Sequence, residues 1–450
     1  MKLKIINANV VSSSGINDCS ILIENEKITA VQPVIDTPAE TVINADHQLV
    51  FPGFIDAHTH FSMDAGDFQT ADSFATGTRA AVFGGTTTII NFADQNKGQT
   101  LEEALAHSMS QASSNCACDY KFHVSVCDWN DHTRTSLFHM GKYGVTSFKA
   151  YMAYDDSRLR DDELLELLRT IKKINGILGV HCENGDLVNA QTRYYLNQRC
   201  TSPEYHPLSR GPEVEAEAIS RLLYIAKIAD CPVHIVHLSS ALGLEEVRRA
   251  RRRGQTVYVE TCPHYLLLED SVYSRSDFEG AKYVCSPPLR STNDCEKLWE
   301  AVQNHEIQTI STDHCSFFFE SQKKYGLTDF SQIPNGMPGT EHRPSLIYSF
   351  GVMSGKLKPE DMCALLSENT AQLFGLYPRK GVIAPGSDAD LVIWGSRPSI
   401  ISAASQLQNT DYTPYEGFPI KGQAKAVFLR GRQVVSDYKY IGTNCGTYVG

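Results

Sequence analysis

The stretch FPGFIDAHTH, residues 51–60, decides how the middle of this 450-residue chain folds. Its apolar residues Phe54 and Ile55 predict a buried strand, and His58 and His60 follow two positions apart. Side chains alternate between the two faces of a strand, so both imidazoles point to the same side. Two neutral imidazoles so placed can share a metal ion, although an HxH pair alone also fits two structural histidines.

Apolar stretches of the same kind recur through the middle of the chain and alternate with stretches of helical periodicity. A helix is expected at residues 161–174, with Leu164, Leu167 and Ile171 on one face, and another at residues 213–230. Alternating strands and helices indicate a parallel sheet, and eight strands fit a TIM-like (β/α)₈ barrel. The expected strands are residues 54–60, 86–92, 121–126, 145–149, 177–181, 233–237, 257–260 and 307–313.

Both ends of the chain have a β-rich texture that differs from the middle. The N-terminal runs are residues 3–11 and 21–31, the second broken by a polar hairpin signal at residues 24–27. The C-terminal runs are residues 391–394, 426–429 and 434–435. We therefore expect a small β-sandwich domain built from residues 1–50 and 376–450 around a catalytic barrel of residues 51–375.

Composition places the chain among globular proteins, with 42% hydrophobic and 21% charged residues. The formal charge of −11 disfavours a nucleic-acid partner, and the basic run at residues 248–253 resembles a solvated helix end. No apolar run reaches the roughly 18 residues of a membrane span, so we expect a soluble cytoplasmic protein without a membrane partner.

Thirteen cysteines occur without a CxxC pair, which favours reduced thiols. We interpret them as small buried residues. A nucleophilic role for Cys182, Cys262, Cys285 or Cys315 is the alternative.

Metal-competent or charged residues end five of the expected strands. Besides the two histidines of residues 51–60, they are Lys149, His181, His237 and Asp313. Barrel enzymes build their chemistry at the C-terminal ends of the strands, so these side chains are expected to meet. Lys149 is the odd member, because an ammonium repels a cation and is costly to bury unpaired.

Seven motifs in the expected order give the chain a resemblance to the cyclic amidohydrolases, specifically the hydantoinase and dihydropyrimidinase branch. The resemblance covers essentially the whole length. The motifs are FIDAHTH at 54–60, SFKAYMAY at 147–154, HCENG at 181–185, HLSS at 237–240, CSPPLR at 285–290, DHCS at 313–316 and NGMPG at 335–339.

This resemblance implies two divalent metal ions, with zinc expected and Mn²⁺, Co²⁺ or Fe²⁺ also compatible with such ligands. His58, His60 and Asp313 would hold the more buried ion, and His181 and His237 the more exposed one. Lys149 would be carboxylated by CO₂ to a carbamate that bridges both ions. The carbamate is an anion, which removes the electrostatic objection to a lysine at this position.

The implied reaction is hydrolysis of the ring amide of cyclic ureides, 5-substituted hydantoins or dihydropyrimidines, to N-carbamoyl amino acids. Asp313 would pass a proton to the leaving nitrogen, and Tyr154 would donate to the developing oxyanion. Ser286 and Asn335 match positions that bind the ring largely through backbone groups, although both residues are also ordinary in turns. A homotetramer or homodimer is the family expectation.

The sequence departs from the patterns of its relatives at two places that concern the substrate. Ser62 stands where dihydroorotase-like relatives place an arginine for a substrate carboxylate, which disfavours an acidic ring. The expected pocket gate is Phe61, Met63, Ala65 and Tyr151, and the small Ala65 leaves room for an aromatic substituent. Three alternatives remain: a non-catalytic dihydropyrimidinase-like scaffold, an allantoinase or other cyclic amidohydrolase, and a deaminase on a related barrel, which would not need Lys149.

Overall fold

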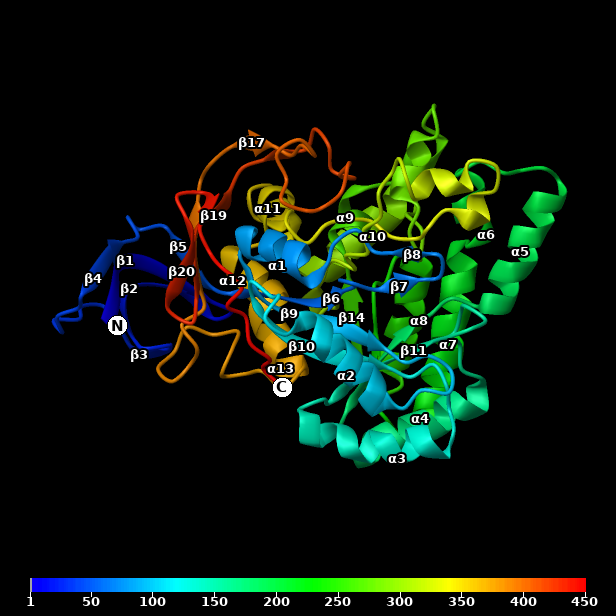
Figure 1. Cartoon of the computed structure of the whole chain (residues 1–450), viewed down its shortest axis with the longest axis horizontal. Helices are drawn as coiled ribbons and strands as arrows, with labels where there is room; N and C mark the ends of the chain where they lie inside the picture. The colour runs from blue at the N-terminus through cyan, green and yellow to red at the C-terminus, as the bar shows by residue number, and fades with distance from the viewer. Residues whose placement is uncertain (1) are drawn as a thin grey trace.

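Eight parallel strands from the middle of the chain form one sheet in the computed structural model, which describes residues 2–450 (Figure 1). Each expected strand overlaps one of them, so the prediction of a TIM-like barrel is confirmed. In spatial order they are β15 (Thr309–Ile310), β14 (Val257–Thr261), β13 (Val233–Ile235), β12 (Ile177–His181), β11 (Ser147–Tyr151), β10 (Asp119–Ser125), β9 (Thr86–Asp94) and β6 (Phe54–Thr59).

The barrel closes between its first and last strands, β6 and β15. Thr59 forms a parallel bridge with His314 just beyond β15. The buried Asp56 carboxylate accepts hydrogen bonds from the Thr312 amide at 3.1 Å and the Thr312 hydroxyl at 2.7 Å. Arg343, which is fully buried, donates to a backbone carbonyl on each of the two strands at 2.8 and 3.0 Å. Closure therefore brings the residues after β6 next to those after β15.

Helices surround the barrel, and the two that the sequence predicts are present. In α4 the expected leucines and Ile171 are buried, the first turn is acidic and the last turn basic, which complements the helix dipole. In α7 a proline occupies the first turn. The helices are α1 (Phe74–Phe83), α2 (Leu101–Ala112), α3 (Asp131–Met140), α4 (Asp161–Lys173), α5 (Gly185–Asn197), α6 (Tyr205–Ser209), α7 (Pro212–Ala229), α8 (Ala241–Arg252), α9 (Pro263–Leu267), α10 (Thr292–Gln303), α11 (Arg343–Ile347), α12 (Pro359–Cys363) and α13 (Asn369–Leu373).

Strands from both chain ends share a second, mixed sheet of nine strands, seen beside the barrel in Figure 1. The expected β-sandwich built from both termini is observed as one mixed sheet to which both chain ends contribute, whereas the domain boundaries at residues 50 and 375 stay a prediction. The strands are β1 (Lys2–Ser12), β2 (Gly15–Glu24), β3 (Lys27–Gln32), β4 (Thr41–Asn44), β5 (Leu49–Pro52), β16 (Leu391–Gly395), β19 (Gln423–Leu429), β20 (Arg432–Ser436) and β21 (Lys439–Tyr440). Two further antiparallel pairs consist of β7 (Asp64–Ala65) with β8 (Phe68–Gln69) and of β17 (Ser399–Ile400) with β18 (Pro419–Ile420).

A buried ionic cluster joins the barrel to the nine-stranded sheet. Asp119 at the start of β10, Asp388 and Asp390 lie close enough to one another to hold a cation. Lys380 fills this position, with Nζ 2.5 Å from Asp119, 2.5 Å from Asp390 and 3.0 Å from Asp388. Arg430 also pairs with Asp119. The cluster is therefore an internal salt bridge network between the two parts of the fold.

The structure corrects the interpretation of the basic run. Arg248 pairs with Glu306, between α10 and β15, at 2.7 Å, and Arg251 donates to the Val257 carbonyl of β14 at 2.6 Å, so the run connects α8 to both segments rather than only facing solvent. All thirteen cysteines are free and most are buried, as expected for reduced thiols. Within residues 2–450, none of the helices combines the length and the apolar character needed to cross a bilayer.

Candidate metal centre

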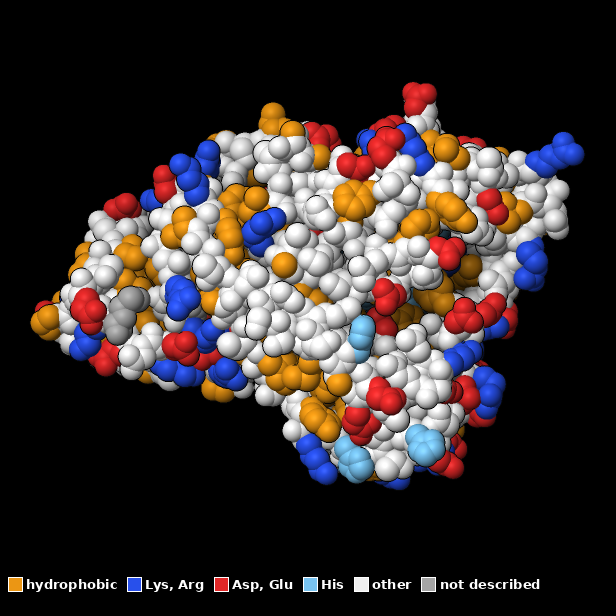
Figure 2. Space-filling model, in the orientation of Figure 1, with side chains coloured by type: hydrophobic (Ala, Val, Ile, Leu, Met, Phe, Trp, Pro, Cys, Tyr) orange, Lys and Arg blue, Asp and Glu red, His pale blue; other side chains and the backbone are white. Residues whose placement is uncertain are grey.

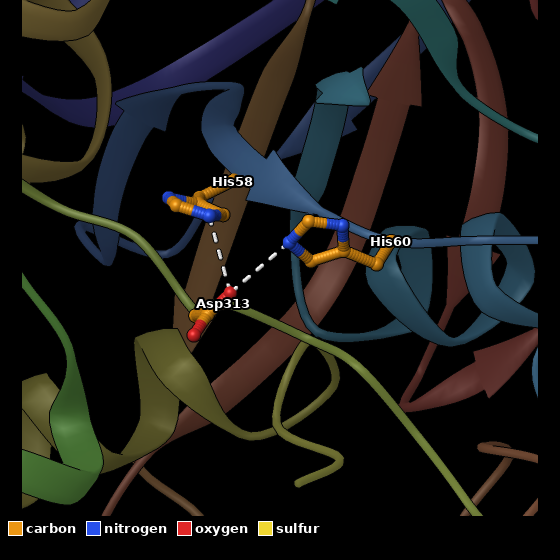
Figure 3. A group of neighbouring side chains, drawn as sticks. All are labelled: His58, His60 and Asp313. Carbon is orange, nitrogen blue, oxygen red and sulfur yellow. Dashed lines mark ion pairs between the residues drawn. The ribbon is translucent and has the colours of Figure 1, made fainter. Parts of the chain in front are cut away.

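His58, His60 and Asp313 meet at the mouth of the barrel (Figure 3). The Nε2 atoms of His58 and His60 lie 3.1 and 3.2 Å from Asp313 Oδ1. Ligands on one tetrahedral ion with bonds near 2.1 Å stand about 3.4 Å apart, so this spacing suits a shared cation. The donor set, two imidazole nitrogens and a carboxylate oxygen, is one that zinc and related metals accept.

The other three residues of the expected set adjoin this group. His181 Nδ1 lies 3.1 Å from His237 Nε2, again a spacing that suits two ligands of one ion. The His237 ring lies 5.3 Å from that of His58, and Lys149 Nζ lies 3.4 Å from His58 Nε2. The structure thus brings all six side chains together at one end of the barrel.

The backbone at this mouth is held in an unusual conformation. Asp313 has φ 49°, His237 φ 39° and Tyr154 φ 69°, all in the left-handed region that non-glycine residues rarely occupy. Such residues cost about 1–3 kcal/mol each and cluster at functional sites. These three turns direct their side chains into the mouth at the points where β15, β13 and β11 end.

Burial sets the protonation of these groups. It lowers the pKa values of His60, His181 and His237, and the nearby Lys149 charge lowers that of His237 further. Burial opposes ionisation of Asp313 as well, but His58 and His60 hold its pKa well below the usual range. Burial thus favours the neutral form of three imidazoles, the form that binds a metal, whereas Glu260 and Asp313 raise the pKa of the fourth, His58.

Lys149 is buried at the floor of the site without an acidic partner. Its side chain is 2% exposed, and among residues 2–450 it makes no ion pair within 4.0 Å. Its Nζ lies 4.7 Å from the centre of the Phe92 ring. Burial lowers its pKa, which favours the neutral amine over the ammonium.

Two buried carboxylates that sequence reasoning missed pair with the proposed ligands His58 and His181. Glu260 Oε1 lies 2.7 Å from His58 Nδ1, and Glu183 Oε2 lies 2.8 Å from His181 Nε2. Arg210 in turn pairs with Glu183 at 2.7 Å. Contacts of this kind fix the ring orientation of a ligating histidine and raise its basicity. The available signals were that Glu260 ends an apolar strand and that Glu183 stands two residues after His181.

A cavity of about 570 Å³ opens above the six side chains. Tyr154, Ser286 and Asn335 line it, as expected for residues near a substrate. Tyr154 keeps 36% of its surface exposed, and desolvation of its hydroxyl raises its pKa to about 12. Ser286 Oγ is buried without a hydrogen-bond partner in the described chain, which leaves it free for a ligand. Figure 2 shows the hollow near β7 and β8, with hydrophobic and acidic side chains at its edge.

Three of the four expected gate residues, Met63, Ala65 and Tyr151, line this cavity. Phe61 does not: it is 1% exposed and packs against Phe74 and His314, so it belongs to the core. The reason is alternation, since a residue directly after the inward-facing His60 points to the opposite side. The cavity wall also contains two aromatic residues that the sequence did not single out, Phe68 and Tyr325, whose rings stack edge to face at 5.3 Å.

The remaining histidines of the middle region lie outside this cavity wall, and two of the buried ones make clear structural contacts. His314 bonds to Asp72 at 3.0 Å, and His206 bonds to the Cys285 carbonyl at 2.8 Å. His234, His264 and His342 are also buried. Burial lowers the pKa of His206 to about 3 and that of His264 to about 4, so both stay neutral.

Comparison with known proteins gives relatives over the full length. The sequence profile of the amidohydrolase family matches residues 49–434. The chain is 41% identical to a D-hydantoinase of Ralstonia pickettii, and the alignment covers 98% of this chain and 97% of the relative. It is 39% identical to a D-phenylhydantoinase of Escherichia coli O81 (strain ED1a), and that alignment covers 98% of this chain and 96% of the relative. The crystal structure of a dihydropyrimidinase from Brevibacillus agri NCHU1002 superimposes with a TM-score of 0.98 at 39% identity, covering 100% of this chain and 98% of that one. The chain therefore belongs to the amidohydrolase family, in its hydantoinase and dihydropyrimidinase branch, because the family profile and these relatives match almost its whole length.

Proposed function

We propose that the protein is a metal-dependent hydrolase that opens the ring amide of cyclic ureides, 5-substituted hydantoins or dihydropyrimidines, to N-carbamoyl amino acids. The observation that carries the proposal is the convergence of four imidazoles, a carboxylate and a buried lysine at the floor of one cavity. Relatives at about 40% identity are named for reactions of this class, which supports the substrate assignment.

Two divalent ions, with zinc as the expected metal, suit the donor set. His58, His60 and Asp313 would hold one ion, and His181 and His237 the other. When bound, such ions supply a water activated for attack at neutral pH and polarise the carbonyl that is attacked. The assignment is supported by imidazoles kept neutral by burial and by the spacing of their facing nitrogens.

Lys149 would reach both ions as a carbamate. In its neutral form, which burial favours, Nζ attacks the carbon of CO₂; an N–C bond forms as one C=O π bond breaks, and one proton leaves, so that the lysine becomes an anion. The supporting observations are the position of Nζ beside His58 and its lack of an ion-pair partner within residues 2–450. An ammonium buried without a partner would be costly, whereas an anion next to two cations is stabilised.

The other residues of the cavity act on the substrate and its protons. Asp313 would take a proton from the attacking water and deliver it to the ring nitrogen that leaves. The Tyr154 hydroxyl, protonated at neutral pH, would donate to the oxygen on which negative charge develops. Ser286 and Asn335, which also line the cavity, would hold the ring mainly through backbone groups.

A turnover panel with metal analysis tests this function. Hydantoin, 5-phenylhydantoin, dihydrouracil and allantoin are incubated with the zinc-loaded protein, and ring-opened products are measured by mass spectrometry. His58→Asn should abolish turnover and reduce bound metal, while the exposed His47→Asn serves as the matched control. A protein that holds no metal and opens none of these rings is the non-catalytic scaffold, and one that opens allantoin alone has a different substrate.

Lys149→Ala tests the carbamate separately. The variant should lose bound metal and activity, and short carboxylic acids added with metal should partly restore both, because they replace the missing carboxylate. A variant that keeps two tightly bound ions and near-normal turnover would exclude the carbamate. The proposed homodimer or homotetramer is measured on the same samples by light scattering, where a monomer would contradict it.

A further inference from the structure

Lys323 is a fully buried lysine outside the metal centre. It begins the short 3₁₀ helix Lys323–Gly326, and its side chain is 0% exposed. Its Nζ donates to two backbone carbonyls, those of Val284 and Gly336, each at 2.7 Å. These acceptors lie 39 and 13 positions away in the sequence, so a single side chain connects two distant segments.

Both segments form the wall of the cavity at which the ring is proposed to bind. Val284 stands two residues before Ser286, and Gly336 directly follows Asn335. The Gly336 amide also donates to the Val284 carbonyl at 2.9 Å, so the segments meet directly as well as through Lys323. Ser286, Asn335 and Gly336 line the cavity, whereas Lys323 does not. Lys323 therefore supports the wall from behind.

Burying the Lys323 amine has a desolvation cost that opposes folding. Burial lowers its pKa to about 7, and among residues 2–450 no acidic group pairs with it within 4.0 Å. The groups that face it are the Cys285 and Cys315 thiols, which burial keeps protonated, and the Phe317 ring, 5.9 Å from Nζ. A methionine of similar length would remove this desolvation cost but would leave the Gly336 carbonyl without its donor. The two effects on stability oppose each other, whereas the connection through Lys323 between the two wall segments depends on the amine alone.

We propose that Lys323 is a positioning residue that fixes the segments carrying Ser286 and Asn335 at the separation a cyclic ureide ring requires. The inference rests on the proposed function, because it assigns the wall that these two residues form to substrate binding. Gly336 leaves this wall little freedom to adjust: its φ is +148°, and a Cβ there would lie 2.3 Å from the Cys315 carbonyl oxygen. Loss of the two Lys323 contacts should therefore change ring binding and leave the metal ligands in place.

Steady-state kinetics of two variants and a matched control test the proposal. Lys323→Met removes both donors, Lys323→Gln keeps a shorter amide donor, and Lys324→Met removes the neighbouring lysine, which pairs only with Glu320 on the surface. For the best ring of the panel, we expect Lys323→Met to raise KM about tenfold, because it deletes two hydrogen bonds behind the binding wall. Its kcat and metal content should match those of the wild type, and Lys323→Gln should have an intermediate KM.

Thermal unfolding separates positioning from a merely structural role. The substitution removes the desolvation cost of the amine and also the donor to the Gly336 carbonyl, two opposing effects, so Lys323→Met should unfold at a temperature close to that of Lys324→Met. A Lys323→Met protein whose KM equals that of the control overturns the inference and leaves the proposed function standing. Loss of metal, or loss of cooperative unfolding in both Lys323 variants, also overturns it, since Lys323 would then serve the fold. A wild-type protein that opens no ring overturns both proposals.

Discussion

Replacing Glu260 with glutamine should weaken metal binding without disturbing the barrel. Glu260 Oε1 lies 2.7 Å from His58 Nδ1 and accepts the His237 backbone amide at 3.2 Å. One carboxylate thereby orients a proposed ligand of each metal ion. Glutamine has the same shape and can keep one oxygen as an acceptor, but it carries no charge, so the change isolates the electrostatic contribution.

The size of the effect follows from how His58 is held. Burial and Lys149 both oppose positive charge on His58, yet Glu260 and Asp313 outweigh them and raise its pKa. Without the Glu260 charge, His58 becomes a weaker base and a weaker ligand. Outer carboxylates of this kind are worth 10- to 100-fold in metal affinity, or about 1.4–2.7 kcal/mol. The upper half of this range is expected because the side chains of His58 and Glu260 are each only 1% exposed.

A competition titration measures this directly. Metal-free protein, prepared with a chelator, is titrated with zinc in the presence of a chromophoric chelator of known affinity. Glu245→Gln is the control, since Glu245 is an exposed partner of Arg248 on α8. If Glu260→Gln binds two zinc ions within about twofold of the wild-type affinity, Glu260 does not tune His58 and the assignment of His58 as a ligand loses its support.

Four further changes test other parts of the structure. Asp313→Asn should lower kcat by about 10²–10⁴-fold with a smaller change in KM, as expected for lost proton transfer, and an effect on KM alone would contradict that role. Ala65→Phe should reduce kcat/KM for 5-phenylhydantoin at least about tenfold more than for dihydrouracil, which corresponds to about 1.4 kcal/mol. Equal losses for the two substrates would show that Ala65 does not contact the phenyl substituent. Lys380→Met leaves the buried Asp390 without a cationic partner, while Asp119 keeps Arg430, and should lower the free energy of unfolding by about 3–5 kcal/mol in urea titrations; an unchanged midpoint would refute the network. Burial raises the pKa of Glu341 from 4.5 to about 8, so between these pH values the folded protein keeps a proton that the unfolded chain releases. The free energy of unfolding should therefore fall as pH rises through this range, by at most about 1.4 kcal/mol per pH unit. Glu341→Gln should remove this slope, and an identical slope in the variant would show that Glu341 is ionised in the fold.

Apolar patterning predicted every barrel strand, but it overextended two of them. The expected strands 233–237 and 307–313 are observed as Val233–Ile235 and Thr309–Ile310. In both cases the strand ends before a proposed metal ligand, His237 or Asp313, whose backbone is in the left-handed conformation. Hydrophobicity reports which residues are buried, whereas the turn that presents a ligand depends on tertiary contacts that a local pattern does not contain.

The proposed ligands were predictable because each is a polar residue at the end of an apolar strand. Their supports were harder to find. Glu260 has the same signature, but nothing in the sequence shows that its partner is an imidazole from a strand 202 positions away. Lys323 lies in an aperiodic segment, and its acceptors are backbone carbonyls, which exist at every residue and leave no trace in a sequence. Phe61 was misplaced because its hydrophobicity suits a cavity wall and a core equally well.

The geometry of closure explains why the first and last barrel strands carry the tightest part of the site. His58 lies in β6, His60 directly follows β6 and Asp313 lies in the segment after β15, so the histidines and the aspartate are distant in sequence and meet only when the barrel closes. The same seam is held by the Asp56 carboxylate on Thr312 and by the bridge between Thr59 and His314. A cation held by this group would bind both sides of the seam and so bind only the closed barrel. By linkage, metal binding and barrel closure must then stabilise each other.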